Sequence, residues 1–392
     1  MKFSVNRRVM LEHLKTMIKV VPKDSPIKEL NGFLIEANED DGYLYMTANN
    51  LKVAVQRKFK PSVETGGNFV MDAKLLVDIL ALLGGDEVIF EEIKPGMITV
   101  KSGGCVYTLR VLSGQKYPRP EIPFPDKTVN ICDIKRMYSR TYAAVGGDGM
   151  SEAFKGIHFD ISPNCFKLES CNTREIAVSE NKMTCGGCME FILSKHTVSY
   201  LTAVAGNEEV EVGSSGPYIV FMKEGMLFSS KKISVDFVDV NKILNSLQTV
   251  YTAAIRSEEF KEEILNTCDL ASMGKETSYI RLEFNESSIC LSTLNEVGNG
   301  ENTIPCVTVK STFGLSNYYS ASALKNALKT VEDRVMLRLD ERGYMLIEDE
   351  RNRFMITPIP DISVRNQFKK IGERKTKGKS GNKTKKKESQ AA

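Results

Sequence analysis

Apolar residues along this chain follow two spacings, one typical of amphipathic helices and one typical of half-buried strands. Residues 72–113 read DAKLLVDILALL, GGDEVIFEE, a KPG turn, MITVKS and CVYTLRVLS. This pattern predicts a helix, an acidic turn and three short strands. Residues 194–234 and 320–360 repeat the same order of elements. The chain therefore contains an internal repeat.

The length of the repeat identifies its units as domains. The valine that opens the first strand after each helix recurs at steps of 122 and 125 residues, at Val88, Val210 and Val335. In the front half of each repeat, one apolar strand position recurs at steps of 124 and 123 residues, at Ile35, Phe159 and Leu282. Solenoid proteins have much shorter repeats, of roughly 20 to 50 residues.

Each repeat reads as strand, helix, several strands, helix and several strands. This order predicts an α+β fold in which two helices pack on antiparallel sheet. We expect three such domains, at residues 1–126, 127–248 and 249–360. Residues 361–392 are rich in Lys, Gly, Ser and Thr and have no apolar period, so we expect a disordered basic tail there.

The composition is that of a globular protein in a reducing compartment. Of the 392 residues, 42% are hydrophobic, but no apolar run is long enough to span a membrane. The start, MKFSVNRRVM, lacks the apolar core of a secretion signal. The nine cysteines are scattered and odd in number, which does not favour a disulfide framework. We therefore expect a cytoplasmic protein.

The net charge is distributed unevenly. Residues 361–392 contain eleven Lys and Arg and three Asp and Glu, a net charge of +8. The whole chain carries +3, so residues 1–360 carry −5. An acidic body does not bind DNA through its overall charge. Any contact with DNA is therefore expected from local basic stripes or from the tail.

The first predicted helix carries a basic stripe. At 100° per residue, Arg8, Lys15 and Lys19 fall within about 40° of one another, opposite the apolar face. For one helix alone, a solvated helix face is the favoured reading, and recurrence in later repeats makes contact with phosphates an equal alternative. Basic pairs at i, i+4 recur in the later repeats, at Arg136 and Arg140 and at Lys325 and Lys329. The helix expected over residues 257–271 departs from this pattern because it is rich in Glu.

Motifs for catalysis or metal binding are scarce. Cys185 and Cys188 form a CxxC pair, but no second pair stands at zinc-finger spacing, and the three histidines are isolated. VGGDGMS at residues 145–151 lacks the Gly-Lys-Ser/Thr of a phosphate loop. We therefore expect no metal, cofactor or catalytic site. A thiol enzyme built on the CxxC pair is the least favoured reading.

Several segments resemble one known family when they are taken together and in register. They are the start MKFSV, FVMDAKLLVDILALLGGDEV, SGGCVYTLRVLSGQKYP, FKGIHFDI, REIAVSE, SYIRLEF and the final TPIP. With the three repeats, they resemble the bacterial sliding clamp, the beta subunit of DNA polymerase III. The resemblance runs from Met1 to about Pro360. None of these segments is a catalytic motif.

The resemblance implies a non-catalytic processivity factor of DNA replication, a head-to-tail homodimer whose six domains form a ring around double-stranded DNA without reading its sequence. Its other partners would be the replicative polymerase, the clamp loader and proteins with short Leu/Phe-rich peptides, and it would work at the nucleoid. Loose phosphate contacts suit a ring that slides. The residues expected to face DNA are Arg8, Lys15, Lys19, Lys23, Lys74, Arg136, Arg140, Lys195, Lys325 and Lys329.

The resemblance also implies a peptide-binding cleft and a ring interface. Apolar anchors beside a few polar groups suit capture of a short peptide, although domain-boundary core residues would give the same pattern. The cleft is expected to be lined by Phe154, Cys171, Thr173, Arg174, Ile176, Val238, Lys242, Ile243, Met355, Ile356, Thr357, Pro358 and Ile359. The interface is expected at Tyr107 and Leu109 of the first domain and at Ala271, Ser272 and Met273 of the third.

The chain differs from the family pattern at these sites. Residues 171–176 read CNTREI where the family usually has Thr-Asp-Gly-His-Arg-Leu, so Thr173 replaces Gly and Glu175 replaces a basic residue. Ala271 and Ser272 are smaller than the usual aliphatic residues, and the basic tail is an addition. Two alternatives therefore stay open. One is a diverged second clamp with altered partner preference, and the other is a non-encircling DNA-binding scaffold whose tail supplies the affinity.

Overall fold

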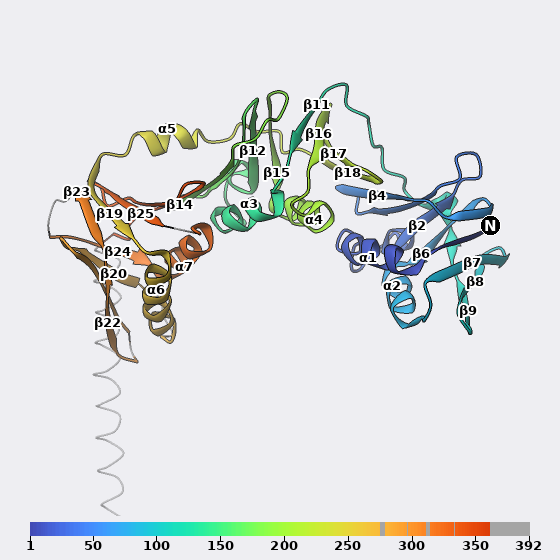
Figure 1. The fold of residues 1–392 in the computed structure, drawn as a ribbon, viewed down its shortest axis with the longest axis horizontal. Helices are drawn as coiled ribbons and strands as arrows, with labels where there is room; N and C mark the ends of the chain where they lie inside the picture. The colour runs from blue at the N-terminus through green and yellow to red at the C-terminus, as the bar shows by residue number, and fades with distance from the viewer. Residues whose placement is uncertain (275–278, 296, 311–313, 333, 361–392) are drawn as a thin grey trace, which may run out of the picture. The chain divides into compact units, whose positions relative to one another are not determined.

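The computed structural model describes residues 1–274, 279–295, 297–310, 314–332 and 334–360. The predicted basic tail, residues 361–392, lies outside the described residues. The chain divides into two compact units, and Figure 1 labels the helices and strands that compose them. Unit 1 comprises residues 1–138, 151–167 and 181–236, and unit 2 comprises residues 139–150, 168–180 and those from 237 onward. Among the described helices, none combines the length and apolar character needed to cross a membrane.

Unit 1 is built on two antiparallel sheets. The smaller sheet has the order β5 (Ser62–Thr65), β1 (Lys2–Asn6), β7 (Glu87–Lys94), β8 (Met97–Ser102) and β9 (Cys105–Arg110). The larger has the order β10 (Leu112–Ser113), β6 (Gly67–Asp72), β2 (Gly32–Ala37), β3 (Leu44–Asn49), β4 (Val53–Phe59), β18 (Met226–Lys231), β17 (Tyr218–Lys223), β16 (Val210–Ser215) and β11 (Thr128–Ile131). The larger sheet joins the first two repeats, because β4 pairs with β18 and places Val55 opposite Phe228.

A further strand pair, β12 (Gly156–Ser162) with β15 (Met189–Ser194), belongs to unit 1, and β13 (Cys165–Cys171) runs across the division between the units. Helix α1 (Arg7–Met17) packs against α2 (Ala73–Leu82) and α4 (Lys195–Ala205). Side-chain caps start these helices: Asp72 Oδ1 accepts the Leu75 N–H at 2.8 Å, and Ser194 Oγ accepts the Thr197 N–H at 3.1 Å. Helix α3 (Ile134–Thr141) ends in unit 2, and the 3-10 segments here are η1 (Lys28–Asn31), η2 (Gly114–Lys116) and η4 (Glu152–Phe154).

Unit 2 also contains two antiparallel sheets. Its larger sheet has the order β14 (Glu175–Asn181), β27 (Asn352–Ile356), β26 (Met345–Glu348), β25 (Val335–Asp340), β19 (Thr249–Ile255) and β23 (Val307–Lys310). The four-stranded sheet has the order β22 (Asn299–Pro305), β21 (Ser288–Leu294), β20 (Tyr279–Phe284) and β24 (Leu315–Ser320). The helical segments are η3 (Tyr142–Ala144), α5 (Val240–Asn245), α6 (Ser257–Ser272) and α7 (Ala321–Thr330).

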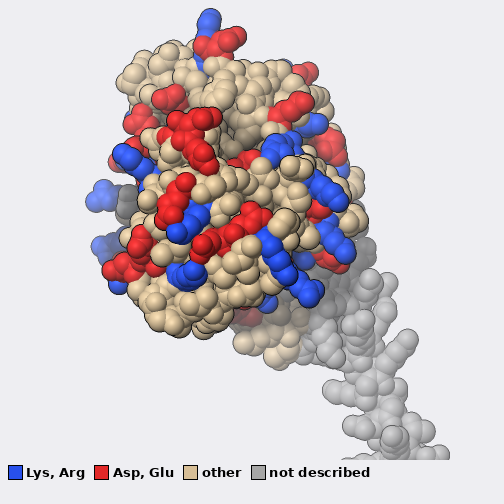
Figure 2. Space-filling view, turned by 90° about the vertical axis from the view of Figure 1, so that its right-hand side faces the viewer, with Lys and Arg blue, Asp and Glu red and all other residues tan. Residues whose placement is uncertain are grey.

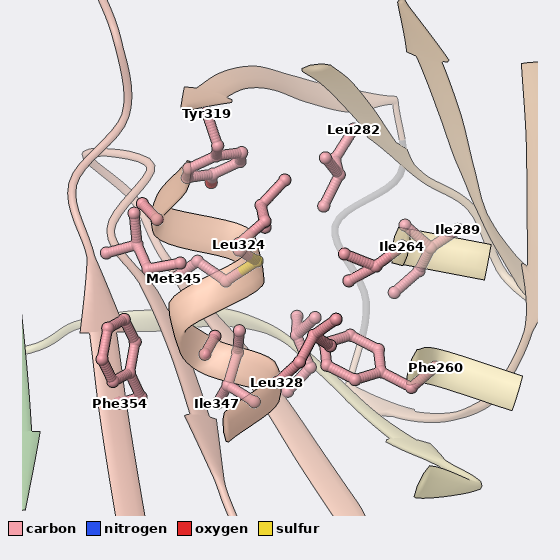
Figure 3. Packing of buried hydrophobic residues seen from close by; sticks show 14 of the residues in the cluster. Phe260, Ile264, Leu282, Ile289, Tyr319, Leu324, Leu328, Met345, Ile347 and Phe354 are labelled. Atoms are coloured by element: carbon pink, nitrogen blue, oxygen red, sulfur yellow. The ribbon is translucent and has the colours of Figure 1, made fainter. Parts of the chain in front are cut away.

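The core of unit 2 lies between its two sheets and the helix pair α6 and α7, which pack against each other. Figure 3 shows Phe260 and Ile264 of α6 close to Leu282 and Ile289 of the four-stranded sheet. Leu324 of α7 lies in the same cluster. The apolar face of α6 is therefore buried, and its four glutamates leave the opposite face polar.

The predicted fold class is confirmed. Each repeat contributes two helices, which are α1 with α2, α3 with α4, and α6 with α7, and every strand pairing that the structure describes is antiparallel. The short helix α5 was not predicted as an element of its own. The division into domains at 1–126, 127–248 and 249–360 stays a prediction, because consecutive repeats share continuous sheets. The first and second repeats share a sheet through the pairing of β4 with β18. The second and third repeats share one through the pairing of β14 with β27, which places Ile176 opposite Met355.

Candidate functional site

The basic residues of α1 and α2 are mostly exposed. Arg8 forms an ion pair, because its Nε lies 3.0 Å from Asp86 Oδ1. Both side chains are exposed, and an exposed ion pair contributes little to the stability of the fold. Figure 2 shows Lys and Arg interspersed with Asp and Glu on the face that it presents. Four of the unit 1 lysines that were predicted to face DNA are exposed and make no ion pair within the described part of the chain: Lys15, Lys19, Lys23 and Lys74.

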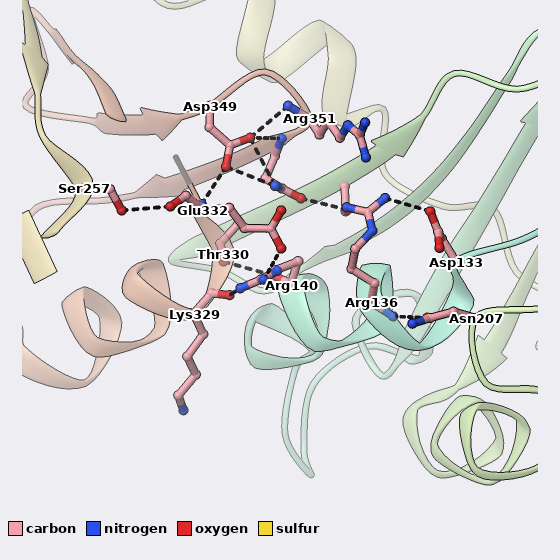
Figure 4. Close-up of polar contacts among 12 residues, drawn as sticks. Asp133, Arg136, Arg140, Asn207, Ser257, Lys329, Thr330, Glu332, Asp349 and Arg351 are labelled. Carbon is pink, nitrogen blue, oxygen red and sulfur yellow. Dashed lines mark hydrogen bonds and ion pairs between the residues drawn. The ribbon is translucent and has the colours of Figure 1, made fainter. Parts of the chain in front are cut away.

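The two arginines of α3 are engaged inside the protein. In unit 1, Arg136 Nη2 lies 3.3 Å from Asp133 Oδ2. In unit 2, Arg140 donates a hydrogen bond to the carbonyl oxygen of Lys329 and forms an ion pair with Glu332 (Figure 4). Both guanidinium groups are half-buried. These arginines therefore stabilise the fold, and contact with DNA by either one stays a prediction.

The remaining predicted DNA contacts lie on α4 and α7. Lys195 is the first residue of α4 and is half-buried. Lys325 Nζ lies 2.7 Å from Asp269 Oδ1 of α6. Lys329 is exposed, with its ammonium group 5.7 Å from the centre of the Tyr142 ring. Lys329 is thus the residue of this group whose charge is most open to an external phosphate.

Most of the predicted cleft residues lie in unit 2, on β14 and β27 and at their ends. The two strands are directly paired, and the Thr357 N–H donates to the Arg174 carbonyl oxygen at 2.9 Å. Thr173 and Arg174 are exposed in the turn before β14, and Thr357 and Pro358 are half-buried. The buried members of the set are Cys171, Ile176, Met355, Ile356 and Ile359.

The other cleft residues lie on separate segments. Asp239 caps α5 through Oδ1, which accepts the Lys242 N–H at 2.8 Å. Lys242 is exposed, and Val238 and Ile243 are half-buried. Phe154 is half-buried at the end of η4 in unit 1. The structure thus brings the β14 and β27 residues together, and the grouping of all thirteen stays a prediction.

Glu175, the acidic departure from the family pattern, turns into unit 2. Its side chain is 9% exposed, and burial raises the pKa of its carboxyl, while hydrogen bonds with Asn172 and Asn326 act in the opposite direction. Asn172 also fixes the turn, because its Oδ1 accepts the N–H groups of Arg174 and Glu175 at 2.8 Å. This carboxyl is therefore satisfied inside the unit and does not add an exposed charge beside β27.

The first half of the predicted ring interface lies on an open sheet edge. Strand β9 is the last strand of the five-stranded sheet, so one side of its backbone has no partner strand among the described residues. Tyr107 is 37% exposed and Leu109 is half-buried. Val106, which sequence reasoning missed, is 61% exposed. An unpaired edge with exposed apolar side chains is a suitable surface for another strand.

The second half of the predicted interface is only partly at the surface. Ala271 belongs to the core of unit 2, and Ser272 Oγ donates to the Cys268 carbonyl oxygen at 2.6 Å within α6. Met273 is 65% exposed. Two more exposed apolar residues, Leu294 and Val297, lie at and just beyond the end of β21.

The turn after β21 lies against the C-terminal end of α6. Asn295 Nδ2 donates a hydrogen bond to the Leu270 carbonyl oxygen at 2.7 Å. Leu270 lies in the last turn of α6, three residues before Met273, the C-cap of that helix. Strand β22, which begins after this turn, is the last strand of the four-stranded sheet. Leu294 and Val297 stand out as apolar residues in the sequence LSTLNEVG, residues 291–298. Their place near the end of α6 follows only from the fold.

The two cysteines of the CxxC pair lie in different environments. Cys185 is buried, and burial raises the pKa of its thiol, which favours the protonated and unreactive form. Cys188 is exposed, and both cysteines are free. In the described ranges, no group of three or more His, Cys, Asp and Glu side chains is arranged to hold a metal ion.

A buried carboxylate holds the chain that leaves α5. Asp340 accepts hydrogen bonds from Arg342 Nε at 2.9 Å and from the Gln248 N–H at 2.8 Å. Burial alone would raise the pKa of Asp340, but the hydrogen bonds from Arg342 and Gln248 outweigh burial and lower it. The ionised form is therefore the one that the folded state stabilises.

This arrangement predicts a pH-dependent loss of stability in Asp340→Asn. A lowered folded pKa means that the carboxylate stabilises the fold above the unfolded value of about 3.9, and that this contribution disappears as pH falls through the folded pKa. We expect the substitution to lower the free energy of unfolding by about 1–3 kcal/mol at pH 7. Urea unfolding measures this free energy at each pH, and the difference between the parent and the variant should become smaller below about pH 4. A gap that stays constant to pH 3 contradicts this account.

One family model and several named relatives match the sequence of this chain. The family model for the DNA polymerase III beta subunit, N-terminal domain, matches residues 1–122. A beta sliding clamp of Mycoplasma capricolum is 21% identical over 352 residues, which cover 86% of this chain and 92% of that protein. A beta sliding clamp of Micrococcus luteus is 19% identical, covering 78% of this chain and 99% of that one.

Solved structures with this fold cover nearly the whole chain. A putative DNA polymerase III beta subunit from Eubacterium rectale matches with a TM-score of 0.84 and 16% identity, over 92% of this chain and 99% of that one. The sliding clamp of Bacillus subtilis matches with a TM-score of 0.82 and 18% identity, over the same shares. Taken together, these structures show that the chain has the fold of the DNA polymerase III beta subunit, and residues 1–122 match the family model for the N-terminal domain of that subunit.

Proposed function

We propose that this chain is a DNA sliding clamp, a non-catalytic subunit that encircles duplex DNA and tethers a replicative polymerase. The observation that carries the proposal is the extent of the likeness. The clamp fold spans 92% of this chain and 99% of the Eubacterium rectale structure, and a named beta sliding clamp aligns over 86% of the chain. Such a protein would work with chromosomal DNA in the bacterial cytoplasm.

Two open sheet edges support closure of a ring by two copies. Strand β9 carries exposed Val106 and Tyr107, and the β22 edge lies beside exposed Met273 and Val297. These are different surfaces of one chain, so contact between them is head-to-tail, and two such contacts close a dimer. Burial of apolar residues on both sides would supply the driving force.

The lysines without internal ion pairs support a loose grip on DNA. Lys15, Lys19, Lys23, Lys74 and Lys329 offer point charges to phosphates, which give affinity without sequence readout. Each neutralised phosphate steepens the salt dependence of binding, with a log–log slope of about 0.9 per contact. Topology then holds the ring on DNA while weak contacts let it slide.

Retention on DNA tests the proposal directly. The protein is loaded onto nicked circular duplex DNA with a bacterial clamp loader and ATP, and the bound fraction is separated by gel filtration. We expect stable retention on the circle and loss when a restriction enzyme linearises it, because a ring slides off a free end. Equal retention on the two forms would refute an encircling clamp.

The cleft supplies a second test. Ile243 is half-buried next to the exposed Lys242, so its side chain is open to a partner without being part of the buried core of unit 2. We expect Ile243→Ala to weaken binding of a Leu/Phe-rich clamp-binding peptide by about 1–2 kcal/mol, or roughly 5- to 30-fold. Fluorescence anisotropy with a labelled peptide measures this. Ile356 is less suitable because it belongs to the core.

Leu265→Ala is a matched control for the cleft, because Leu265 is an exposed aliphatic residue on α6. Its peptide affinity should equal that of the parent. If both variants bind the peptide as tightly as the parent, the cleft does not include α5.

A non-encircling scaffold driven by the basic tail is not favoured, because the likeness to clamps extends over both units. Deleting residues 366–392 distinguishes the two readings. We expect the shortened protein to be retained on circular DNA as the full chain is. Loss of all DNA binding would favour the scaffold.

A further inference from the structure

Unit 1 contains a counterpart of the strand pair that carries the predicted cleft. Strand β4 pairs with β18 as β14 pairs with β27. Phe228 of β18 and Phe354 of β27 are both fully buried. Successive side chains along a strand point to opposite faces of the sheet. Ser229 and Met355, which follow the two phenylalanines, therefore hold equivalent positions.

The facing strands agree with this correspondence. Ser229 lies opposite Ala54 of β4. Met355 lies opposite Ile176 of β14, and both of these are predicted cleft residues. All four residues are buried. Because Ala54 and Ser229 are short where the two cleft residues are long, the strand pair of unit 1 leaves space above its sheet.

A cavity of about 350 Å³ opens over these short side chains. Besides Ala54 and Ser229, it is lined by Tyr218 of β17 and by residues 118–121, which follow the first repeat. This segment is fixed in place, because Asn49 Nδ2 donates a hydrogen bond to the Pro118 carbonyl oxygen at 2.8 Å. Ligand sites in proteins typically have volumes of about 300–1,000 Å³. The cavity is therefore large enough for one or two side chains of a ligand.

The hydroxyl group of Ser229 is not used by the fold. Ser229 is 3% exposed, and its Oγ has no hydrogen-bond partner within the described part of the chain. Buried polar groups in folded proteins are nearly always hydrogen-bonded, and leaving one unpaired costs free energy. Since Ser229 lines the cavity, a ligand in the cavity supplies the missing hydrogen bond.

Leu51 is held in an unfavourable backbone conformation at the same cavity. Its φ of 68° lies in the left-handed region, which bulky residues rarely adopt. The turn keeps it there, because the Leu51 N–H donates to Asn49 Oδ1 at 2.8 Å. Glycine would relieve the strain, and the leucine side chain is 59% exposed, so it gains little packing within the chain. Its apolar surface is available to a ligand.

The rim of the cavity carries unpaired charges of both signs. Lys52 and Glu121 are exposed, and neither makes an ion pair among the described residues. Arg119, by contrast, is paired with Glu36 at 2.8 Å. A carboxylate is attracted to Lys52 and repelled by Glu121. The charges therefore favour a ligand with an acidic group at the Lys52 end.

We propose that this cavity is a second peptide site, which takes an apolar side chain next to an acidic residue of a partner protein. The apolar side chain packs on Leu51, Val53 and the ring of Tyr218. A backbone group of the peptide hydrogen-bonds to Ser229, and the carboxylate pairs with Lys52. The choice of a peptide rests on the proposed function, because the counterpart strand pair carries the predicted peptide cleft.

Methyl NMR spectra of the full chain, labelled at Leu and Val, test the proposal. The probes are acetyl-Ala-Leu-Glu-Ala-amide and acetyl-Ala-Leu-Lys-Ala-amide. We expect the signals of Leu51 and Val53 to shift to saturation with the Glu peptide, with a dissociation constant about fivefold lower than for the Lys peptide. Absence of shifts, or equal affinity for both peptides, overturns the proposal. Larger shifts with a single-stranded thymidine oligonucleotide would assign the site to nucleic acid and overturn it as well.

Two substitutions separate binding from the stability of the fold. Ser229→Ala removes an unpaired hydroxyl, and Leu51→Gly relieves backbone strain, so neither should lower the midpoint of urea unfolding. Both should weaken binding of the Glu peptide by about threefold or more. Unchanged peptide affinity in both variants contradicts the proposed contacts.

Charge reversal tests the direction of the peptide. Lys52→Glu should make the Lys peptide the tighter ligand. Lys60→Glu, a matched change at the exposed lysine just after β4, should keep the preference of the parent. If Lys52→Glu keeps that preference, or if Lys60→Glu reverses it, the carboxylate does not pair with Lys52 and the proposal fails.

Two further measurements keep this site distinct from the proposed clamp and its cleft. Ile243→Ala should leave the Leu51 shifts unchanged, and their loss would mean that they report the predicted cleft, which overturns the second site. Lys52→Glu should be retained on circular DNA like the parent. A parent chain that shows the Leu51 shifts but is not retained on circular DNA refutes the clamp and supports the peptide site.

Discussion

Tyr107→Asp is expected to convert the dimer into monomers and to abolish retention on circular DNA. Tyr107 is 37% exposed on the open edge strand β9, where we place the contact between two copies. Closing the ring would bury the new carboxylate without a partner, and an unpaired buried charge costs several kcal/mol. A cost of only about 3 kcal/mol raises the dissociation constant more than 100-fold.

Light scattering at micromolar concentration measures this effect. The parent should have a mass near twice 43.7 kDa and the variant a mass near 43.7 kDa. Leu51→Asp is the control, because Leu51 is an exposed apolar residue of the same unit in the turn between β3 and β4. The control should stay dimeric. A dimeric Tyr107→Asp variant would place the ring contact elsewhere.

The repeated order of helices and strands could be predicted from the sequence because it depends on local patterns of capping, turn and apolar residues. Asp72 and Ser194 each precede an amphipathic run, and both cap a helix in the structure. Turn residues separate alternating apolar positions, which fixes the strand pairs. Since these signals recur about every 120 residues, the order of elements followed from the sequence alone.

The contacts of individual side chains did not follow from the sequence, because they depend on residues far apart in the chain. Arg140 reads as an exposed member of a basic pair, yet it bonds to Glu332, 192 residues away. Ala271 reads as a surface residue at the end of α6, yet it lies in the core. Burial at the end of a helix depends on which face the helix turns toward its sheet and on the residue at which the helix ends. The local sequence pattern specifies that end only to within one or two residues.

Phe260→Ala is expected to produce the largest loss of stability among the substitutions considered. Phe260 is fully buried on α6, close to Ile264 and the facing strands of the four-stranded sheet (Figure 3). Removing a buried aromatic ring leaves a cavity and costs about 3–5 kcal/mol. This is a large part of the roughly 5–15 kcal/mol by which a typical domain is stable.

Urea unfolding followed by tyrosine fluorescence measures the loss, because the chain has no Trp and both Tyr251 and Tyr319 are buried in the same core. Leu265→Ala on the exposed side of the same helix is the control and should change stability by about 0.5 kcal/mol or less. Since α6 also carries Met273 at its end, Phe260→Ala should weaken dimer formation in proportion to the loosening of α6. If it costs no more than Leu265→Ala, then the acidic helix is not held by its apolar face.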